Sequence, residues 1–110
     1  MLTLDDLHDA ILETVSIAID AKTIALAFTP IAVDGAPARV TLIAHDWKSF
    51  SCPRQDPWGH ALYWRVNVAQ GPFEIDRGLI RLELEMQSGD LIEIHAVSLE
   101  RIDTREAPAS

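Results

Sequence analysis

The strongest structural signal in the chain is the stretch Ile80-Arg81-Leu82-Glu83-Leu84-Glu85-Met86-Gln87-Ser88-Gly89-Asp90-Leu91-Ile92-Glu93-Ile94. Apolar and charged residues alternate in it with the period of two that is typical of a half-buried strand. Gly89 lies in the short break between the two runs, and glycine supplies the positive φ that hairpin turns need. The stretch therefore predicts an antiparallel hairpin with one apolar face toward a core. A shift of one residue would bury the charges, so we expect a well-fixed register.

The second run of this hairpin changes phase near Ala96. Ile92 and Ile94 occupy even positions, whereas Val97 and Leu99 occupy odd positions. A β-bulge, or a strand end that is buried on both sides, would account for the change.

Alternation of the same kind extends through most of the chain. Val15, Ile17 and Ile19 alternate with small or polar residues, and after a break at Ala21-Lys22 the run 23–28 places large apolar residues on one face and alanines on the other. This pattern predicts a hairpin whose second face is only partly exposed. Further extended segments are predicted over 39–46 and 61–68, a loop over 30–37, and a segment over 47–53 that continues the 39–46 strand or pairs with it.

The segment Thr3–Glu13 is the best helix candidate. Thr3 can act as an N-cap, and Asp5 and Asp6 would lie in the first turn, where a helix favours negative charge. Apolar residues then follow at helical spacing: Leu4, Leu7, Ala10 and Ile11.

These patterns predict a mainly β fold, α+β at most. We expect an antiparallel β-sandwich or roll of about seven or eight strands with one short N-terminal helix. The chain has 110 residues, the usual size of one domain. Residues 1–110 are therefore expected to form a single β-rich domain, with residues 103–110 as a flexible tail.

The charge balance limits the partners of the chain. Its 17 acidic and 9 basic residues give a net charge of -8. Nucleic-acid binding needs a basic surface, and the sequence contains no run of Lys and Arg, so we expect no nucleic-acid partner. The same charge argues against a membrane surface. It favours a protein partner with a basic surface.

The sequence also predicts a compartment. Cys52 is the single cysteine, so an internal disulfide is impossible and a reducing environment fits best. The start of the chain carries acids and lacks the positive region of a signal peptide. No apolar run approaches the roughly 20 residues that span a bilayer. We expect a cytoplasmic protein.

The most irregular segment, residues 52–60, carries several candidate binding residues. Two prolines stiffen it, and its glycine permits a tight turn. A rigid loop with an aromatic and ionisable groups suits recognition, so Arg54, Asp56, Trp58 and His60 are candidate binding residues. The alternative is a structural loop in which Trp58 packs on the sheet and Arg54 pairs with Asp56.

His8 and Asp9 are further candidate binding residues. A carboxylate beside an imidazole can orient it for base catalysis. On a helix, however, adjacent side chains point about 100° apart, so Asp9 would not hold His8 there. The alternative is a structural role, in which His8 forms a hydrogen bond to the backbone.

Other chemistry has little support in the sequence. The four histidines show no metal-binding spacing, and no nucleotide-binding loop occurs, so no metal and no cofactor are predicted. Glu83, Glu85 and Glu93 could supply a carboxylate pair for glycoside hydrolysis, but a solvated strand face fits them better. We name no catalytic residue and favour a chain that is not an enzyme.

Three segments carry a resemblance to known proteins: Leu7-His8-Asp9-Ala10-Ile11-Leu12, residues 53–59 around the Pro-Trp-Gly loop, and Met86-Gln87-Ser88-Gly89-Asp90. Together they resemble an uncharacterised family of small bacterial proteins with an LHDA opening and a PWG loop, similar to putative toxin-immunity proteins. The resemblance implies a small β-rich bacterial protein without an established activity, and it supplies no catalytic residues.

Three functional hypotheses follow. The leading one is a non-enzymatic, immunity-like protein-binding module that covers a basic partner. The second is a small-molecule-binding or enzymatic domain that uses the Arg54–His60 loop together with His8. The third is a self-associating structural protein, because exposed strand edges invite pairing and a symmetric homodimer is the commonest oligomer.

Overall fold

The computed structural model describes residues 3–33, 35–53 and 64–105 of the chain. The described elements are, in order, the 3-10 turn η1 (Asp5–Leu7) and the strands β1 (Ile11–Ala18), β2 (Thr23–Thr29), β3 (Arg39–Ser51), β4 (Trp64–Asp76), β5 (Leu79–Met86) and β6 (Leu91–Thr104). Neighbouring strands are antiparallel throughout. They form one closed barrel in the order β1-β2-β3-β6-β5-β4.

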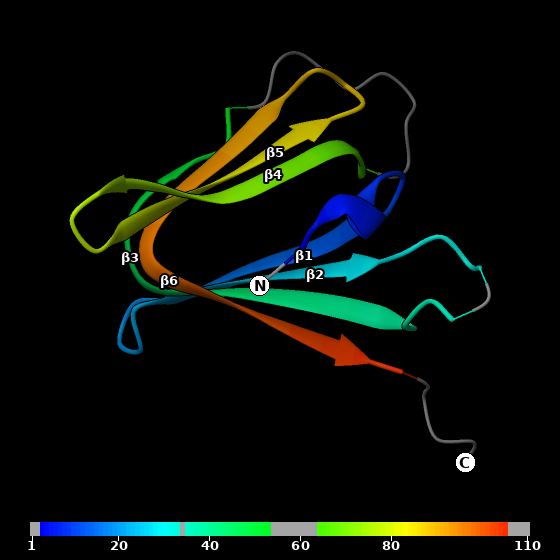
Figure 1. Cartoon of the computed structure of the whole chain (residues 1–110), viewed down its shortest axis with the longest axis horizontal. Coiled ribbons are helices and arrows are strands. Elements are labelled where there is room, and N and C mark those ends of the chain that lie inside the picture. Colours follow the sequence, from blue (N-terminus) through cyan, green and yellow to red (C-terminus); the bar gives the residue numbers. More distant parts are fainter. Residues whose placement is uncertain (1–2, 34, 54–63, 106–110) are drawn as a thin grey trace.

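The mainly β, antiparallel fold is confirmed, and its strands are longer and fewer than the pattern suggested. Residues 47–51 continue the 39–46 strand, so that both belong to β3. Within the described residues there are six strands. Long strands suffice because β3 and β6 each bend from one layer of the flattened barrel into the other (Figure 1).

The bend of β3 coincides with a backbone irregularity at Asp46. Asp46 has a positive φ of 54°, and its N–H donates to the carbonyl of Lys22 at 2.8 Å. The register with β6 then shifts between Trp47 and Ser49, opposite Ala96. This irregularity explains the predicted phase change of β6, because a bulge in one strand re-aims the side chains of the pair.

The predicted hairpin 80–94 is confirmed in its register. Leu82 lies opposite Ile94, and Leu84 lies opposite Ile92. All four side chains are fully buried. Glu83 lies on the other face of the sheet, as the two-residue period requires. The apolar row of this hairpin therefore forms part of the core that fills the barrel.

The short N-terminal helix is a single 3-10 turn, and the remainder of the segment Thr3–Glu13 is not helical. η1 covers three residues, and the residue before it, Leu4, provides no side-chain cap. The chain turns away at Asp9, which has a φ of 68°, and then enters β1. A short helix has little stability without packing, and here Leu4, Leu7 and Ala10 are buried against the barrel through a turn instead.

The C-terminal end is ordered further than predicted. Asp103 pairs with Val40, and Thr104 pairs with Arg39, so both belong to β6. Residues 106–110 of the predicted tail lie outside the described residues. Within the described part of the chain, no helix has the length and apolar character that crossing a membrane requires.

Candidate functional site

The loop residues Arg54, Asp56, Trp58 and His60 lie outside the described residues. Their roles as binding residues, and the alternative of a structural loop, stay predictions.

His8 has the structural contact that the sequence suggested. Its ring atom Nδ1 lies 2.6 Å from the carbonyl oxygen of Asn67 on β4. Its other ring nitrogen, Nε2, lies 3.5 Å from Asp9 Oδ2. The two neighbours meet because neither lies in a helix, so the argument against their contact from helical geometry does not apply.

Asp9 is fixed by the strands around it. Its N–H donates to the carbonyl of Val66 at 2.8 Å, and its own carbonyl accepts a bond from Arg65 Nη1 at 2.9 Å. Gln87 Nε2 donates to the Asp9 carboxylate. These contacts hold the left-handed backbone at Asp9 and give this residue a structural task.

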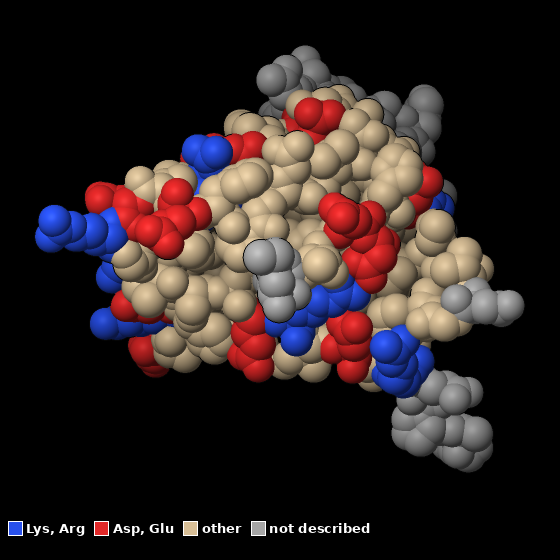
Figure 2. All heavy atoms as spheres, in the orientation of Figure 1, with Lys and Arg blue, Asp and Glu red and all other residues tan. Residues whose placement is uncertain are grey.

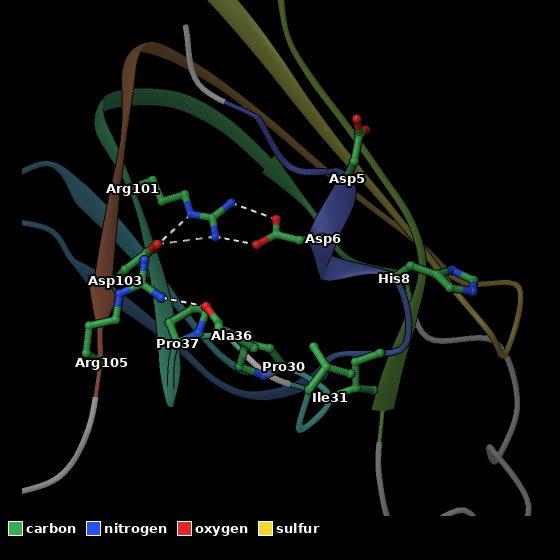
Figure 3. A pocket seen from close by; sticks show the side chains of 12 residues that line it. Asp5, Asp6, His8, Pro30, Ile31, Ala36, Pro37, Arg101, Asp103 and Arg105 are labelled. Atoms are coloured by element: carbon green, nitrogen blue, oxygen red, sulfur yellow. Dashed lines mark hydrogen bonds and ion pairs between the residues drawn. The ribbon is translucent and has the colours of Figure 1, made fainter.

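A pocket of about 420 Å³ opens where η1, the connection 30–37 and the end of β6 meet (Figure 3). Proline and aliphatic side chains of the connection form an apolar wall. Arg101, Asp103 and Arg105 line the opposite side, because a strand turns every second residue to the same face. Asp6 reaches toward Arg101 from η1 (Figure 3).

Arg101 is the centre of this pocket, and its hydrogen-bonding capacity is used up. Nε donates to Asp103 Oδ1 at 2.8 Å, and Nη1 donates to both the Thr3 carbonyl and Asp6 Oδ1 at 2.8 Å. Nη2 donates to Asp6 Oδ2 at 2.6 Å and more weakly to Asp103 Oδ2 at 3.5 Å. A guanidinium carries five N–H donors, so all of them are engaged.

This network shifts the ionisation of its members. The hydrogen bond from Arg101 is the main cause that lowers the pKa of Asp6 below its ordinary 3.8; partial burial opposes it, and the positive charge of Arg101 adds to it. The same hydrogen bond raises the pKa of Arg101 above its ordinary value. Because its carboxylate partners already neutralise Arg101, the pocket offers that cation to no ligand. The contacts of Arg101 with Thr3 and Asp6 fasten the N-terminal segment to β6.

A second candidate surface lies on the outer side of β5 and β6, and we call it the acidic face. It consists of the outward residues Arg81, Glu83, Glu85, Leu91, Glu93 and His95. Glu83 lies directly opposite Glu93 in the ladder, and Arg81 lies opposite His95. Like charges opposite each other destabilise a sheet, and Arg81 and His95 lie beside the two glutamates.

The glutamates of the acidic face are held in place by neighbours on the same surface. Asn67 Nδ2 donates to Glu85 at 2.7 Å. His95 Nε2 lies 2.7 Å from Glu93. Arg81 Nε lies 2.9 Å from Glu83 but makes no well-aligned hydrogen bond to it. The acidic face is therefore pre-organised, with carboxylates that keep free lone pairs for a partner.

A shallow depression of about 70 Å³ lies within the acidic face. Val68 and Leu91 provide apolar sides, and Glu83 and Glu85 provide carboxylates. Val68 and Leu91 are 38% and 40% exposed, so apolar area is accessible beside the charges. An aliphatic stem that ends in a cation matches this combination, as in lysine or arginine.

Charges on the remaining surface are mixed. On the face seen in Figure 2, basic side chains lie next to acidic ones rather than in a large patch of one sign. Across residues 3–33, 35–53 and 64–105, no group of three or more His, Cys, Asp or Glu side chains is arranged to hold a metal ion.

Sequence reasoning missed the Arg101 network. Asp6 and Arg101 are far apart in the chain, and no local sequence pattern predicts their contact. The acidic face was interpreted as a solvated strand face. The signal that could have marked it is the hairpin register itself, because centring the turn on Ser88 places Glu83 opposite Glu93.

Comparison with known proteins supports the fold. No family model and no curated protein matches the chain. Among solved structures, the chain is similar to a crystal structure of an uncharacterised protein from Neisseria gonorrhoeae, with 12% sequence identity and a TM-score of 0.54, over 86% of this chain and 90% of that one. At this identity, the likeness establishes a shared fold alone.

Proposed function

We propose that this chain is a non-enzymatic protein-binding module that recognises a basic partner through its acidic face. The observation that carries the proposal is the ladder pair of Glu83 and Glu93. Two carboxylates directly opposite each other repel and lower the stability of a sheet, and departures from such a local rule are expected at functional sites.

The geometry of the acidic face supports a specific mode of recognition. A lysine or arginine of the partner lays its aliphatic stem between Val68 and Leu91 in the depression. Its charged head then meets Glu83 and Glu85. The positive charge of the partner reduces the repulsion among the carboxylates, and this reduction contributes to the free energy of binding. The partner is covered rather than modified, which is an immunity-like mode of action.

The acidic character of the whole chain supports the same proposal. The net charge of -8 attracts a basic partner over long range and speeds the encounter. We place this activity in the cytoplasm, where a chain with a single cysteine stays reduced.

The small-molecule alternative has less support. The pocket beside η1 includes His8, which the sequence singled out. However, every donor of Arg101 is engaged. His8 itself contacts the backbone of β4.

The test is affinity capture from an extract of the source cell with two matched double variants. Glu83→Gln with Glu93→Gln neutralises the acidic face, and Asp20→Asn with Glu74→Gln removes the same charge from exposed positions elsewhere. We expect the wild type and the control to retain one basic protein, and the face variant to lose at least about tenfold in affinity, or about 1.4 kcal/mol. Recovery of no protein other than the bait, or equal retention by both variants, would refute the proposal.

A further inference from the structure

Histidines lie beside carboxylates at three places in the described part of the chain, and two of these pairs share one geometry. His45 Nε2 lies 2.8 Å from Glu100, and His95 Nε2 lies 2.7 Å from Glu93. At these distances the ring N–H donates a hydrogen bond to the carboxylate, so the proton occupies Nε2. Neither ring therefore offers the lone pair of Nε2 to a metal ion.

The imidazole of His8 is held in the opposite way. Its Nδ1 lies 2.6 Å from the backbone carbonyl oxygen of Asn67 on β4. A carbonyl oxygen only accepts hydrogen bonds, so Nδ1 carries the proton, and in the neutral ring Nε2 keeps its lone pair. Metal-binding histidines in proteins are fixed in the same manner, with one ring nitrogen bound to a carbonyl or carboxylate and the other facing the metal.

Asp9 presents one carboxylate oxygen to this free ring nitrogen. Its Oδ2 lies 3.5 Å from His8 Nε2, which is long for a hydrogen bond. Gln87 Nε2 donates to the other oxygen, Oδ1, and no hydrogen bond to Oδ2 occurs among the described residues. The backbone of Asp9 is fixed as well, because its N–H donates to Val66 and its carbonyl accepts from Arg65. Both side chains of the pair are thus oriented by neighbours that leave the facing atoms available.

The separation of the two facing atoms suits a shared metal ion. Zinc binds a histidine nitrogen at about 2.0 to 2.1 Å and a carboxylate oxygen at about 2.0 to 2.2 Å, so a tetrahedral angle places the two ligand atoms about 3.4 Å apart. The 3.5 Å between His8 Nε2 and Asp9 Oδ2 is close to this value. The two side chains are 61% and 41% exposed, so an ion can reach them from solvent. His8 also points away from the guanidinium of Arg101 (Figure 3).

We propose that His8 Nε2 and Asp9 Oδ2 bind Zn²⁺, with water molecules in the remaining positions. An imidazole nitrogen favours a transition-metal ion of this kind over Mg²⁺ and Ca²⁺, which prefer oxygen ligands. Because the chain supplies two ligands, the bound ion keeps positions that a further ligand can occupy. The net charge of -8 attracts cations to the protein. The pair lies between η1 and β1, apart from Glu83 and Glu93, so this inference does not depend on the proposed function.

The test is calorimetric titration of the untagged chain with ZnCl₂ at neutral pH. His8→Gln removes the ligand nitrogen, and Asp9→Asn removes the carboxylate but keeps a residue type that tolerates the φ of 68°. His45→Gln is the matched control, because it removes a histidine whose Nε2 already donates to a carboxylate. We expect the wild type and the control to bind one ion with similar affinity, and His8→Gln and Asp9→Asn each to lose at least about tenfold.

Nuclear magnetic resonance of the wild type gives a second measurement that needs no substitution. Addition of ZnCl₂ is expected to shift the ring nitrogen resonances of His8 before those of His45 and His95, whereas MgCl₂ shifts none of them. A wild type that binds no zinc overturns the proposal. Zinc that shifts the other histidines and not His8, or that binds His8→Gln as tightly as the wild type, overturns it too.

Discussion

The outer faces of the β1–β2 hairpin and the β5–β6 hairpin differ sharply. On β1 and β2, the outward positions carry small uncharged residues, such as Ser16 opposite Ala25. On β5 and β6 they carry Glu83 opposite Glu93. Both hairpins contain strands that bury aliphatic residues at alternate positions, such as Ile24 and Leu26 on β2 and Leu82 and Leu84 on β5. Period-two alternation thus fixes what faces the core, and it leaves the outer face free to be adapted to a partner.

If the two hairpins are equivalent inside, truncating either inner row should have the same large effect. Leu26 on β2 and Leu84 on β5 are both fully buried. We expect Leu26→Ala and Leu84→Ala each to lower the free energy of unfolding by about 2 to 5 kcal/mol. Urea unfolding measures both values. A cost below about 1 kcal/mol for either one would mean that the core is not shared equally by the two hairpins.

In the β4–β5 hairpin, the backbone of β4 at Gly71 lies close to the backbone of β5 at Arg81. Gly71 has a φ of 117°, and a Cβ atom there would lie 2.6 Å from the carbonyl oxygen of Arg81. Gly71→Ala is expected to cost about 2 to 3 kcal/mol from strain and displacement. Gly78 has a φ of 70° with nothing within 4 Å of such an atom, so Gly78→Ala should cost less. Thermal unfolding of the two variants checks the order, and equal costs would contradict it.

The sequence predicted what local periodicity controls. It identified the register of the 80–94 hairpin and the burial of Leu82 and Leu84. It failed at the N-terminus, where the spacing of Leu4 and Leu7 fits a helix and equally fits a turn that packs both residues on the barrel. Only the tertiary structure decides between the two. It also could not join Asp6 to Arg101, because that contact depends on where the barrel places the end of β6.

The Arg101 network joins two parts of the barrel. It fastens the N-terminal segment, which packs beside β4, to β6 where that strand pairs with β3. Asp6→Asn removes the carboxylate and leaves the Arg101 side chain, only 12% exposed, with weaker acceptors. Because Asp6 is itself about half exposed, we expect a cost of only about 1 kcal/mol at neutral pH.

The pH dependence of the destabilisation by Asp6→Asn tests whether the effect comes from the charge of Asp6. The folded pKa of Asp6 lies below the ordinary 3.8, so its contribution to stability is complete above that value and is lost as the pH falls through the lower folded pKa. The difference between wild type and Asp6→Asn in urea unfolding should therefore narrow toward about pH 3. A difference that is the same at acidic and neutral pH would assign the effect to packing instead of charge.

The smallest effect is expected at the acidic face, and it has the opposite sign. Glu93→Gln removes one charge from the pair with Glu83 and keeps an acceptor for His95, so the free energy of unfolding should rise by about 0.2 to 1 kcal/mol. Glu85→Gln is the matched control, because Glu85 lies opposite Leu91 and gains nothing from neutralisation. If Glu93→Gln stabilises the chain while weakening capture of the basic partner, the repulsion is retained for binding. If it destabilises the chain, Glu93 serves the fold, and the contrast between the two outer faces loses its functional meaning.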